Sequence, residues 1–391
     1  MNKTEILKVA SEFGSPSFVF DLDILSDRMK EIKSIVGDDV SLCYSIKANP
    51  FLIDAMTKLT DHLEVCSPGE LNICIARNVD MKSIIFSGVN KTAADVKKAV
   101  ECDLGTYTAE SMQHLTLLNN EAIAQNKVIP VLLRLTSGNQ FGMDEAVLTQ
   151  VIRDRDMYTG VKIKGIHFFS GTQKKKTAEN EKEIDYLLSF MENIKAETGF
   201  EFEKLEYGPG LPFPYFANED FSDTLSPLKQ ALPALKKAAA KYELTIEMGR
   251  FYASSCGYYL TSIVDTKTNK DVNYCIIDGG INHINYYGQT LAMKLPIISH
   301  YPEKSGNMKD WAICGSLCTA ADLVVRKYPF TELAIGDLLV FENIGAYSIT
   351  EGIYLFLSRR MPRVILYSKE KGAVLVRDFY NSDLLNTIQE Y

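Results

Sequence analysis

The 391-residue sequence is poor in the features that mark membrane, metal-binding and nucleic-acid-binding proteins. No stretch approaches the ~18 consecutive apolar residues of a membrane span, and the first residues, MNKTEILKVASEFG, lack the apolar segment of a signal peptide. The five histidines form no H-E-x-x-H or H-x-H arrangement, so we expect no metal site. A net charge of −8 gives no general basic face for nucleic acid or an anionic membrane. The expectation is a cytoplasmic protein that acts on small molecules.

The eight cysteines do not form the pattern of a disulfide framework or a zinc site. They lie mostly within apolar runs and include no C-x-x-C pair, so we interpret them as reduced and mostly buried thiols. Hydrophobic residues make up 46% of the chain and charged residues 24%, with no low-complexity tract, which is typical of a globular protein. The length is sufficient for two domains.

The first two thirds of the chain alternate between β-rich runs and stretches with helical spacing. Helical spacing occurs, for example, in residues 52–59 and 94–100. Eight such β-α units predict a (β/α)8 barrel, also called a TIM barrel. The alternative is a doubly wound sheet, whose first βα turn would carry G-x-G-x-x-G, whereas this chain has KANP there. The eight expected strands are residues 41–46, 62–66, 83–86, 104–108, 130–135, 162–169, 204–208 and 244–247.

From residue 258 onward the pattern changes to one strand after another, which predicts a C-terminal all-β domain. The segment SFVFD, residues 17–21, is expected to add a strand to it. We therefore expect residues 1–22 to contribute to the β domain, residues 23–257 to form the barrel and residues 258–391 to form the β domain. The expected strands are residues 258–264, 273–278, 337–343, 354–358, 363–368 and 373–378, the last two joined as a hairpin by KEKG.

Polar and glycine-rich segments follow the expected barrel strands. The carboxyl ends of barrel strands form the mouth in which active sites lie, so these residues are expected to meet there. Lys47, Glu64 and Arg134 end the first, second and fifth strands. The segments FSGTQ (169–173), GPGLP (208–212) and EMGR (247–250) end the sixth, seventh and eighth.

Three of these features together predict pyridoxal phosphate as the cofactor. The glycines after the seventh and eighth strands let backbone N–H groups approach a phosphate, and Arg250 adds a bidentate donor. Lys47 offers an amine that can bind the cofactor covalently. Glu247 offers a carboxylate to the pyridine nitrogen.

The same segments resemble motifs of the fold-type III pyridoxal phosphate family, which includes ornithine, arginine and diaminopimelate decarboxylases and alanine racemase. YSIKANP is similar to the lysine motif, GPGLP to the glycine loop and EMGR to E-P-G-R. CGSLCTAAD is similar to the cysteine motif and GDLLVFENIGAYS to the late tyrosine motif. The resemblance covers nearly the whole chain and implies an alanine racemase-like barrel with a C-terminal β domain.

The resemblance also implies roles for individual residues. Lys47 would carry the cofactor, Glu247 would face its pyridine nitrogen, and Cys318 would reach the cofactor of the second subunit in a homodimer and donate a proton to Cα. The remaining expected cofactor contacts are Glu64, Arg134, Phe169, Thr172, Gly208, Gly210, Gly249, Arg250 and Tyr347.

Three departures from the family pattern concern the substrate and the cofactor ring. Phe169 stands where the family has the second histidine of its H-x-H motif, which stacks on the ring. Thr319 follows the cysteine where decarboxylases of basic amino acids have Asp or Glu, and Tyr286 stands where diaminopimelate decarboxylases have a substrate-binding arginine. We therefore expect decarboxylation of an amino acid without a distal ammonium group, free, conjugated or linked to a carrier protein, in specialised metabolism.

Two alternatives remain at this stage. A racemase would use Lys47 with a second acid or base, although alanine racemases set an arginine rather than a glutamate against the pyridine nitrogen. A non-enzymatic pyridoxal phosphate carrier would resemble the single-barrel members of the fold, which lack a β domain.

Overall fold

The computed structural model describes residues 1–289 and 291–389, which divide into two compact units. The barrel unit consists of Arg28–Phe213 and Asp223–Tyr252. The β unit consists of Met1–Asp27, Pro214–Ser222 and the described residues from Ala253 onward. Each unit is described by itself.

The barrel unit is built on a closed barrel of parallel strands, as the alternation in the sequence predicts. Each strand pairs with the next, and the last, β9, pairs in parallel with the first, β2. The strands are β2 (Val40–Ser45), β3 (His62–Val65), β4 (Ile84–Phe86), β5 (Thr106–Ala109), β6 (Ile129–Arg134), β7 (Val161–Phe169), β8 (Lys204–Gly208) and β9 (Glu243–Met248).

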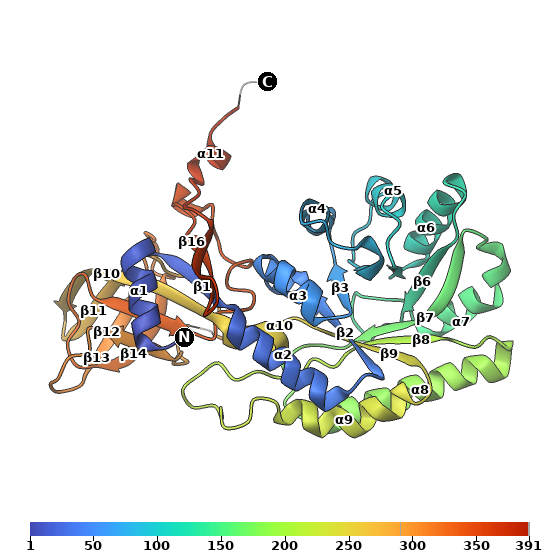
Figure 1. Ribbon diagram of the computed structural model, residues 1–391, viewed down its shortest axis with the longest axis horizontal. Coiled ribbons are helices and arrows are strands. Elements are labelled where there is room, and N and C mark those ends of the chain that lie inside the picture. The colour runs from blue at the N-terminus through green and yellow to red at the C-terminus, as the bar shows by residue number, and fades with distance from the viewer. Residues whose placement is uncertain (290, 390–391) are drawn as a thin grey trace. The chain divides into compact units, whose positions relative to one another are not determined.

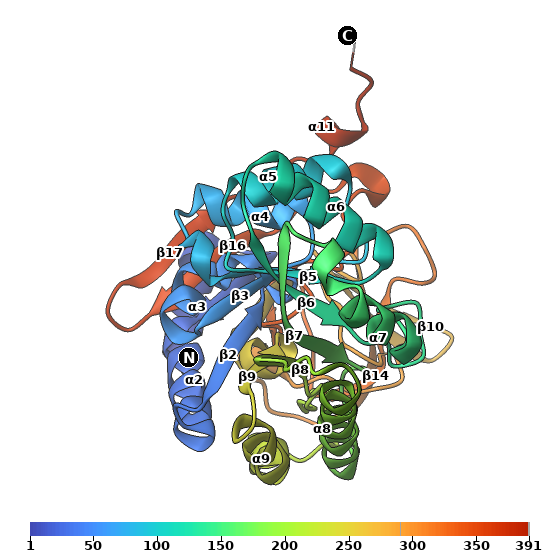
Figure 2. The ribbon, with the colours of Figure 1, turned by 90° about the vertical axis from the view of Figure 1, so that its right-hand side faces the viewer.

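Helices α4 to α9 surround these strands (Figure 2). Several of these helices begin directly after a capping residue whose side chain accepts a hydrogen bond from a backbone N–H of the first turn. These capping residues are Ser67, Thr92, Ser111 and Asp144. The helices are α2 (Leu22–Val36), α3 (Ile53–Leu59), α4 (Pro68–Ala76), α5 (Ala93–Glu101), α6 (Met112–Ala124), α7 (Glu145–Arg153), α8 (Ala178–Thr198), α9 (Ser226–Ala239) and α10 (Arg250–Ala253).

The β unit contains a nine-stranded sheet (Figure 1). Its path runs β14-β13-β11-β10-β1-β16-β17, and β15 pairs with both β10 and β12. The strands are β1 (Ser17–Asp21), β10 (Gly257–Asn269), β11 (Val272–Ile277), β12 (Ile298–Tyr301), β13 (Lys309–Cys314), β14 (Leu323–Phe330), β15 (Leu338–Glu342), β16 (Arg363–Ser368) and β17 (Gly372–Arg377). The strand expected at residues 17–21 is β1, which lies between β10 and β16.

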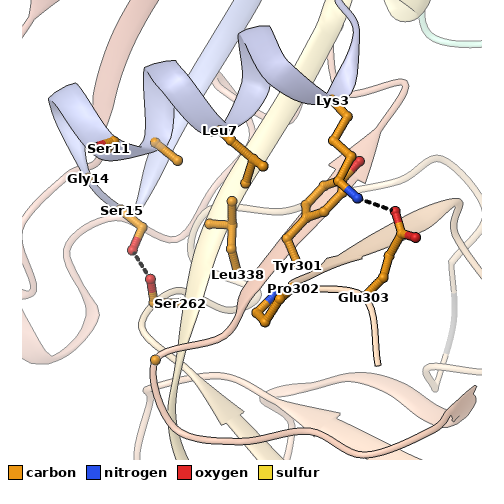
Figure 3. Close-up of a pocket in the computed structure, with 12 residues that line it drawn as sticks. Lys3, Leu7, Ser11, Gly14, Ser15, Ser262, Tyr301, Pro302, Glu303 and Leu338 are labelled. Atoms are coloured by element: carbon orange, nitrogen blue, oxygen red, sulfur yellow. Dashed lines mark hydrogen bonds and ion pairs between the residues drawn. The ribbon is translucent and has the colours of Figure 1, made fainter. Parts of the chain in front are cut away.

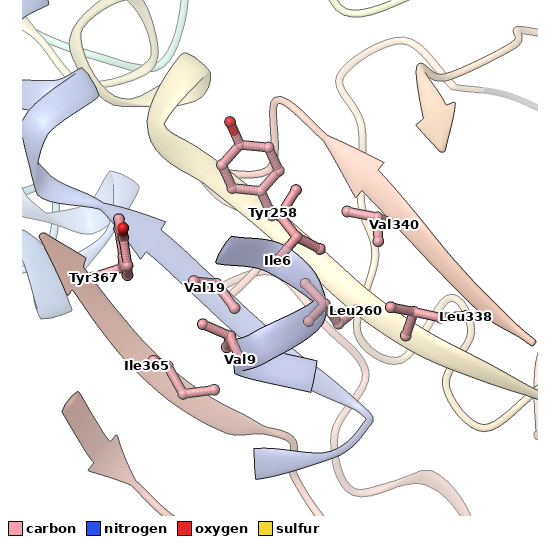
Figure 4. Packing of buried hydrophobic residues seen from close by; sticks show 9 residues of the cluster. All are labelled: Ile6, Val9, Val19, Tyr258, Leu260, Leu338, Val340, Ile365 and Tyr367. Carbon is pink, nitrogen blue, oxygen red and sulfur yellow. The ribbon is translucent and has the colours of Figure 1, made fainter. Parts of the chain in front are cut away.

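Helix α1 (Lys3–Phe13) covers one face of this sheet. It buries Ile6 and Val9 against apolar side chains of β1, β10, β15 and β16 (Figure 4). A capping box between Asn2 and Glu5 fixes its first turn. Burial of these apolar side chains holds the N-terminal segment to strands that follow more than two hundred residues later.

The prediction of a strand at residues 354–358 is wrong. This segment forms a short 3-10 helix, η6 (Phe356–Ser358), in which Leu357 and Ser358 have φ of +59° and +48°. The Tyr354 hydroxyl donates to the Ser348 and Ile349 carbonyls, so the segment folds back on the preceding loop instead of joining a sheet. Strands β12, β13 and β14 were not expected from the sequence. The short helix α11 (Asp383–Asn386) follows the last hairpin.

A pocket of about 680 Å³ lies beside α1 in the β unit (Figure 3). The ion pair between Lys3 and Glu303, 2.7 Å, and the hydrogen bond between Ser15 and Ser262, 2.6 Å, lie in its wall. None of the residues predicted to form the active site lines it.

No helix in the described part of the chain is long and apolar enough to cross a membrane.

Candidate active site

Lys47 lies at the mouth of the barrel, in the 3-10 turn η1 (Ile46–Ala48) directly after β2. Its Nζ atom is 2.7 Å from Glu64 Oε2 and 3.6 Å from Glu247 Oε1. The strand register explains this meeting, because β2 lies between β3 and β9 and pairs Ser45 with Glu64 and Cys43 with Glu247. The structure therefore brings together three residues that are separated in the sequence by up to two hundred positions.

Glu247 is buried and held from both sides. Ser45 Oγ donates a hydrogen bond of 2.7 Å to its Oε1, and His167 Nε2 lies 3.2 Å from its Oε2. Burial opposes ionisation, but the Lys47 ammonium and the His167 hydrogen bond hold the pKa of Glu247 well below its usual range. Glu247 is thus a carboxylate suited to pair with a protonated pyridine nitrogen.

Glu206 is a buried acid that the sequence interpretation missed. It is 1% exposed, and neither carboxyl oxygen has a hydrogen-bond partner among the described residues. Donor atoms of Glu206, Glu247 and His167 all lie within 4.8 Å of one another. Burial raises the pKa of Glu206 well above its usual range, and the charge of Glu247 raises it further. Burial and the neighbouring carboxylate thus favour the neutral form of Glu206, whereas Lys47 and His167 favour the ionised form of Glu247. Side chains alternate between the two faces of the strand KLEYG, residues 204–208. This alternation could have placed Glu206 inside the barrel, on the strand face opposite to that of Leu205 and Tyr207.

We expect Glu206→Gln to change the pH dependence of stability. A carboxyl group whose pKa rises on folding binds its proton more tightly in the folded state, so it lowers stability as pH increases above the pKa of the unfolded chain, about 4.3. Glutamine imitates the neutral acid and removes this loss. The melting temperature of the variant relative to wild type should therefore rise as the pH increases above about 5. Thermal unfolding measures it, with the exposed Glu201→Gln as control, and parallel curves for Glu206→Gln and wild type would contradict the assignment.

The loops after β7 and β8 form a glycine cradle. Gly210 has a φ of +61°, and a Cβ atom there would lie 1.9 Å from the carbonyl oxygen of Gly171. A Cβ atom on Gly208 would lie 2.5 Å from the ring of Phe169, its partner in the strand register. Lys174 N donates to Gly210 O at 2.9 Å and ties the two loops together. Only glycine fits at these positions, which leaves backbone N–H groups accessible to a phosphate.

The other predicted cofactor residues of the barrel lie at the ends of the same strands. Phe169 ends β7 and is half-buried, as is Thr172 in the loop that follows. Gly249 and the buried Arg250 follow β9, where α10 begins. Their contacts with a cofactor remain predictions.

Arg134 ends β6 and belongs to a second charged group. Its Nη1 donates to Glu110 Oε1 at 2.8 Å, and both side chains are buried. Lys91, also buried, donates to the Gly88 carbonyl at 2.6 Å, and burial lowers its pKa to about 8. Both residues lie in polar segments that follow expected strands, SGVNK (87–91) and TAES (108–111), but neither was assigned a role from the sequence, because a single charged residue after a strand gives no sign of burial.

In the β unit, Cys318 and Thr319 lie exposed on one loop. Buried Asp322 holds this loop, because its carboxylate accepts hydrogen bonds from Ile281 N at 2.9 Å and Leu317 N at 2.7 Å. A Cβ atom on Gly280 or Gly315 would collide with that carboxylate. The glycine and aspartate of CGSLCTAAD thus present Cys318, although sequence reasoning assigned a role only to the cysteine and its neighbour.

The two predicted tyrosines also lie in the β unit. Tyr286 is 3% exposed, and its hydroxyl donates to the Glu342 carbonyl at 2.6 Å. Its ring packs against Tyr215 and Phe216. Tyr347 is half-buried and has a φ of +67°. A role of Tyr286 in substrate binding and of Tyr347 at the cofactor remains a prediction.

The barrel site fits pyridoxal phosphate. An amine lies beside a carboxylate whose ionised form is stabilised, and glycines that exclude side chains form a cradle at the same mouth. A (β/α)8 barrel with this donor set and a second, all-β unit defines a pyridoxal phosphate enzyme of the alanine racemase-like fold.

Comparison with known proteins identifies the family. Residues 22–254 match the model of the pyridoxal-dependent decarboxylase family, pyridoxal binding domain. The chain therefore belongs to the pyridoxal-dependent decarboxylases, and it is an amino-acid decarboxylase that uses pyridoxal phosphate.

Individual relatives extend along the whole chain. It is 26% identical to an L-glutamyl-(BtrI acyl-carrier protein) decarboxylase of Niallia circulans, over 99% of this chain and 96% of that one. It is 24% identical to a 2-((L-alanin-3-ylcarbamoyl)methyl)-2-hydroxybutanedioate decarboxylase of Staphylococcus aureus, over 90% and 94%. The structure of diaminopimelate decarboxylase from Methanocaldococcus jannaschii with L-lysine matches its fold with a TM-score of 0.86 at 24% identity, over 98% and 94%. These findings give no support to the racemase alternative.

Proposed function

We propose that this enzyme decarboxylates an amino acid whose distal end is acidic or conjugated, including one linked to a carrier protein. The observation that carries the proposal is the loop around Cys318. Residues 315–321 contain no carboxylate, and the nearest one, Asp322, is 3% exposed and occupied by backbone N–H groups. Thr319, which replaces the family's acidic residue, supplies only a neutral hydroxyl.

The relatives support the same choice. One acts on a glutamyl group carried by a protein, and another on a conjugated hydroxybutanedioate. Neither name describes a free basic amino acid. Diaminopimelate decarboxylases are also similar to this chain, so the choice between these substrates depends on the residues that face the distal group.

Different residues of this chain have different roles in the proposed decarboxylation. Bound pyridoxal phosphate would supply the electron sink for the pair released with CO2. Lys47 would hold the cofactor, and the glycine cradle with Arg250 would bind its phosphate. Ser45 and His167 keep the Glu247 carboxylate in place, so that it can keep a proton on the pyridine nitrogen. Cys318 would deliver the proton that replaces the carboxylate at Cα.

We also propose a homodimer in which Cys318 of one subunit completes the site of the other. The β unit exposes many large apolar side chains near its C-terminal end, which supports contact with a second copy. They are Ile353, Leu355, Phe356, Leu357, Val374, Leu375, Val376, Leu384, Leu385 and Ile388.

Ornithine, lysine and meso-diaminopimelate are expected to be poor substrates. A hydrogen bond between a carboxylate and a distal ammonium group is worth ~1.5–3 kcal/mol, or roughly 10- to 100-fold in kcat/KM, and the neutral hydroxyl of Thr319 cannot supply the carboxylate. Steady-state kinetics of CO2 release across free, conjugated and carrier-linked amino acids measure the preference. A kcat/KM for ornithine, lysine or diaminopimelate above that of every neutral, acidic or conjugated candidate would contradict the proposal.

A variant that gains activity on basic amino acids gives a second test of the role of Thr319. Thr319→Asp should raise kcat/KM for ornithine or lysine by roughly tenfold, because it restores a carboxylate beside Cys318. Thr319→Asn has nearly the same shape without the charge and should not. Equal values for the two variants would show that position 319 does not face the distal group.

A further inference from the structure

A pocket of about 550 Å³ in the β unit is lined by both Cys318 and two consecutive arginines, Arg359 and Arg360. Cys318 and these arginines are separated by some forty residues of sequence, including two strands, β14 and β15. The link between them is direct: Arg359 Nη2 donates a hydrogen bond of 2.8 Å to the carbonyl oxygen of Ser316. The arginines thus border the loop that presents Cys318.

Neither arginine forms an ion pair with a carboxylate among the described residues. Arg360 instead lies over the ring of Phe379, with its guanidinium carbon 4.3 Å from the centroid. Arg363 lies 4.1 Å from the same ring but pairs with Asp378 at 2.7 Å. Stacking on an aromatic ring orders the Arg360 guanidinium without neutralising it, and the bond to the Ser316 carbonyl engages a single N–H of Arg359, so both arginines keep N–H donors and a positive charge for a ligand.

Besides Cys318, the other ionisable groups of the pocket lining are Asp278 and His283. Asp278 accepts hydrogen bonds from Ser15 Oγ, Thr261 Oγ1 and Ser262 N, and burial raises its pKa. His283 is buried, and burial lowers its pKa to about 3, so it is neutral. The two guanidinium groups are thus the cationic groups of the pocket lining; Asp322 and Asp378, outside the lining, interact electrostatically with Arg359 and Arg360 respectively.

We propose that Arg359 and Arg360 bind an anionic group at the distal end of the substrate. This inference rests on the proposed function, in which Cys318 approaches the reacting Cα and the adjoining pocket receives the part of the substrate beyond it. Two guanidinium groups suit a carboxylate or phosphate, each of which takes paired N–H donors. The same pair repels a distal ammonium group, which adds to the effect of Thr319.

The anionic group bound by the two arginines has two candidate origins, and the experiment distinguishes between them. It is a carboxylate of the substrate itself, or the phosphate in the pantetheine arm of a carrier protein. Citrate and 4′-phosphopantetheine are the probes, titrated calorimetrically into the holoenzyme so that the phosphate site of the cofactor is occupied. Binding of citrate alone assigns the first source, and binding of phosphopantetheine alone the second.

The test compares wild type with Arg359→Ala/Arg360→Ala. The affinity for the bound probe should fall at least about tenfold, and with an accepted substrate KM should rise by a similar factor while kcat changes less. Arg359→Lys/Arg360→Lys keeps the charge and should recover part of the affinity. Arg155→Ala is the matched control, because Arg155 also donates to a backbone carbonyl and lies over a ring, Phe200, but in the barrel unit.

Cofactor absorbance and melting temperature show whether each variant is folded and loaded. Equal affinity of wild type and the double alanine variant for both probes would overturn the proposal. If the arginines control probe binding but no candidate amino acid loses CO2, the anion pocket stands and the proposed function fails. The two inferences are thus separable.

Discussion

Lys47→Ala is expected to abolish the visible absorbance of the purified enzyme and to lower kcat by on the order of 10³-fold or more. Wild-type protein should be yellow, because we expect Lys47 to bind the cofactor covalently at the mouth of the barrel. Its amine is the one that lies within 3.6 Å of Glu247, the carboxylate fitted to the pyridine nitrogen. Loss of this amine removes both the covalent link and the exchange of cofactor between enzyme and substrate.

The attachment site is identified by borohydride reduction, which fixes the cofactor to its lysine, followed by peptide mass mapping. Lys91 is the relevant competitor, because it is also buried and its pKa is lowered to about 8, so part of it is a free amine near neutral pH. Label on the Lys47 peptide alone supports the assignment. Label on Lys91, or on any other lysine, would refute it.

Mixing Lys47→Ala chains with Cys318→Ala chains is expected to restore activity that neither variant has alone. Loss of the proton donor should by itself cost about a hundredfold or more. If Cys318 completes the site of the partner, a heterodimer contains one site with both residues intact. At equal concentrations half of the dimers are heterodimers, so about a quarter of wild-type activity should return after subunit exchange.

Subunit exchange must be shown independently, for example with chains of different mass tags. A mixture of Lys47→Ala with a second barrel variant, Glu247→Ala, is the negative control, because each heterodimer then carries one lesion in each of its two barrels and no arrangement of the dimer leaves an intact site. Recovery in this control would show that the returning activity does not come from complementation. Once exchange is shown, absence of recovery with Cys318→Ala would place Cys318 in the site of its own subunit.

Much of the architecture follows from local sequence. Period-two and period-3.6 patterns are set by neighbouring residues, which is why all eight barrel strands lie where the alternation predicts them. Glycines 208 and 210 could be assigned to a cradle because only glycine tolerates that geometry. Lys47 and Glu247 could be paired because parallel barrel strands end at one mouth.

Other features depend on contacts that no local pattern contains. The apolar run at residues 354–358 resembles a strand, but the Tyr354 hydroxyl bonds to carbonyls of the preceding loop and the backbone turns instead. Strands β12 and β13 pair with β15 and β11, which are distant in the sequence, and β14 joins the sheet through β13. Their own composition is too irregular to reveal them.

The sequence by itself determined the barrel, the cofactor and the reactive residue types, because each is encoded by short-range periodicity or by a residue with unique chemistry. Tertiary structure alone decided the electrostatic surroundings of each ionisable side chain. The neutral form of Glu206 is favoured because it is buried beside another carboxylate and has no hydrogen-bond partner among the described residues. The ionised form of Glu247 is favoured because Lys47 and His167 lie close to it. Folding also places Arg359 and Arg360 in one pocket with Cys318, without an ion pair between either guanidinium and a carboxylate among the described residues. Electrostatic free energies depend on burial and distance, and both are properties of the folded chain rather than of its sequence neighbours.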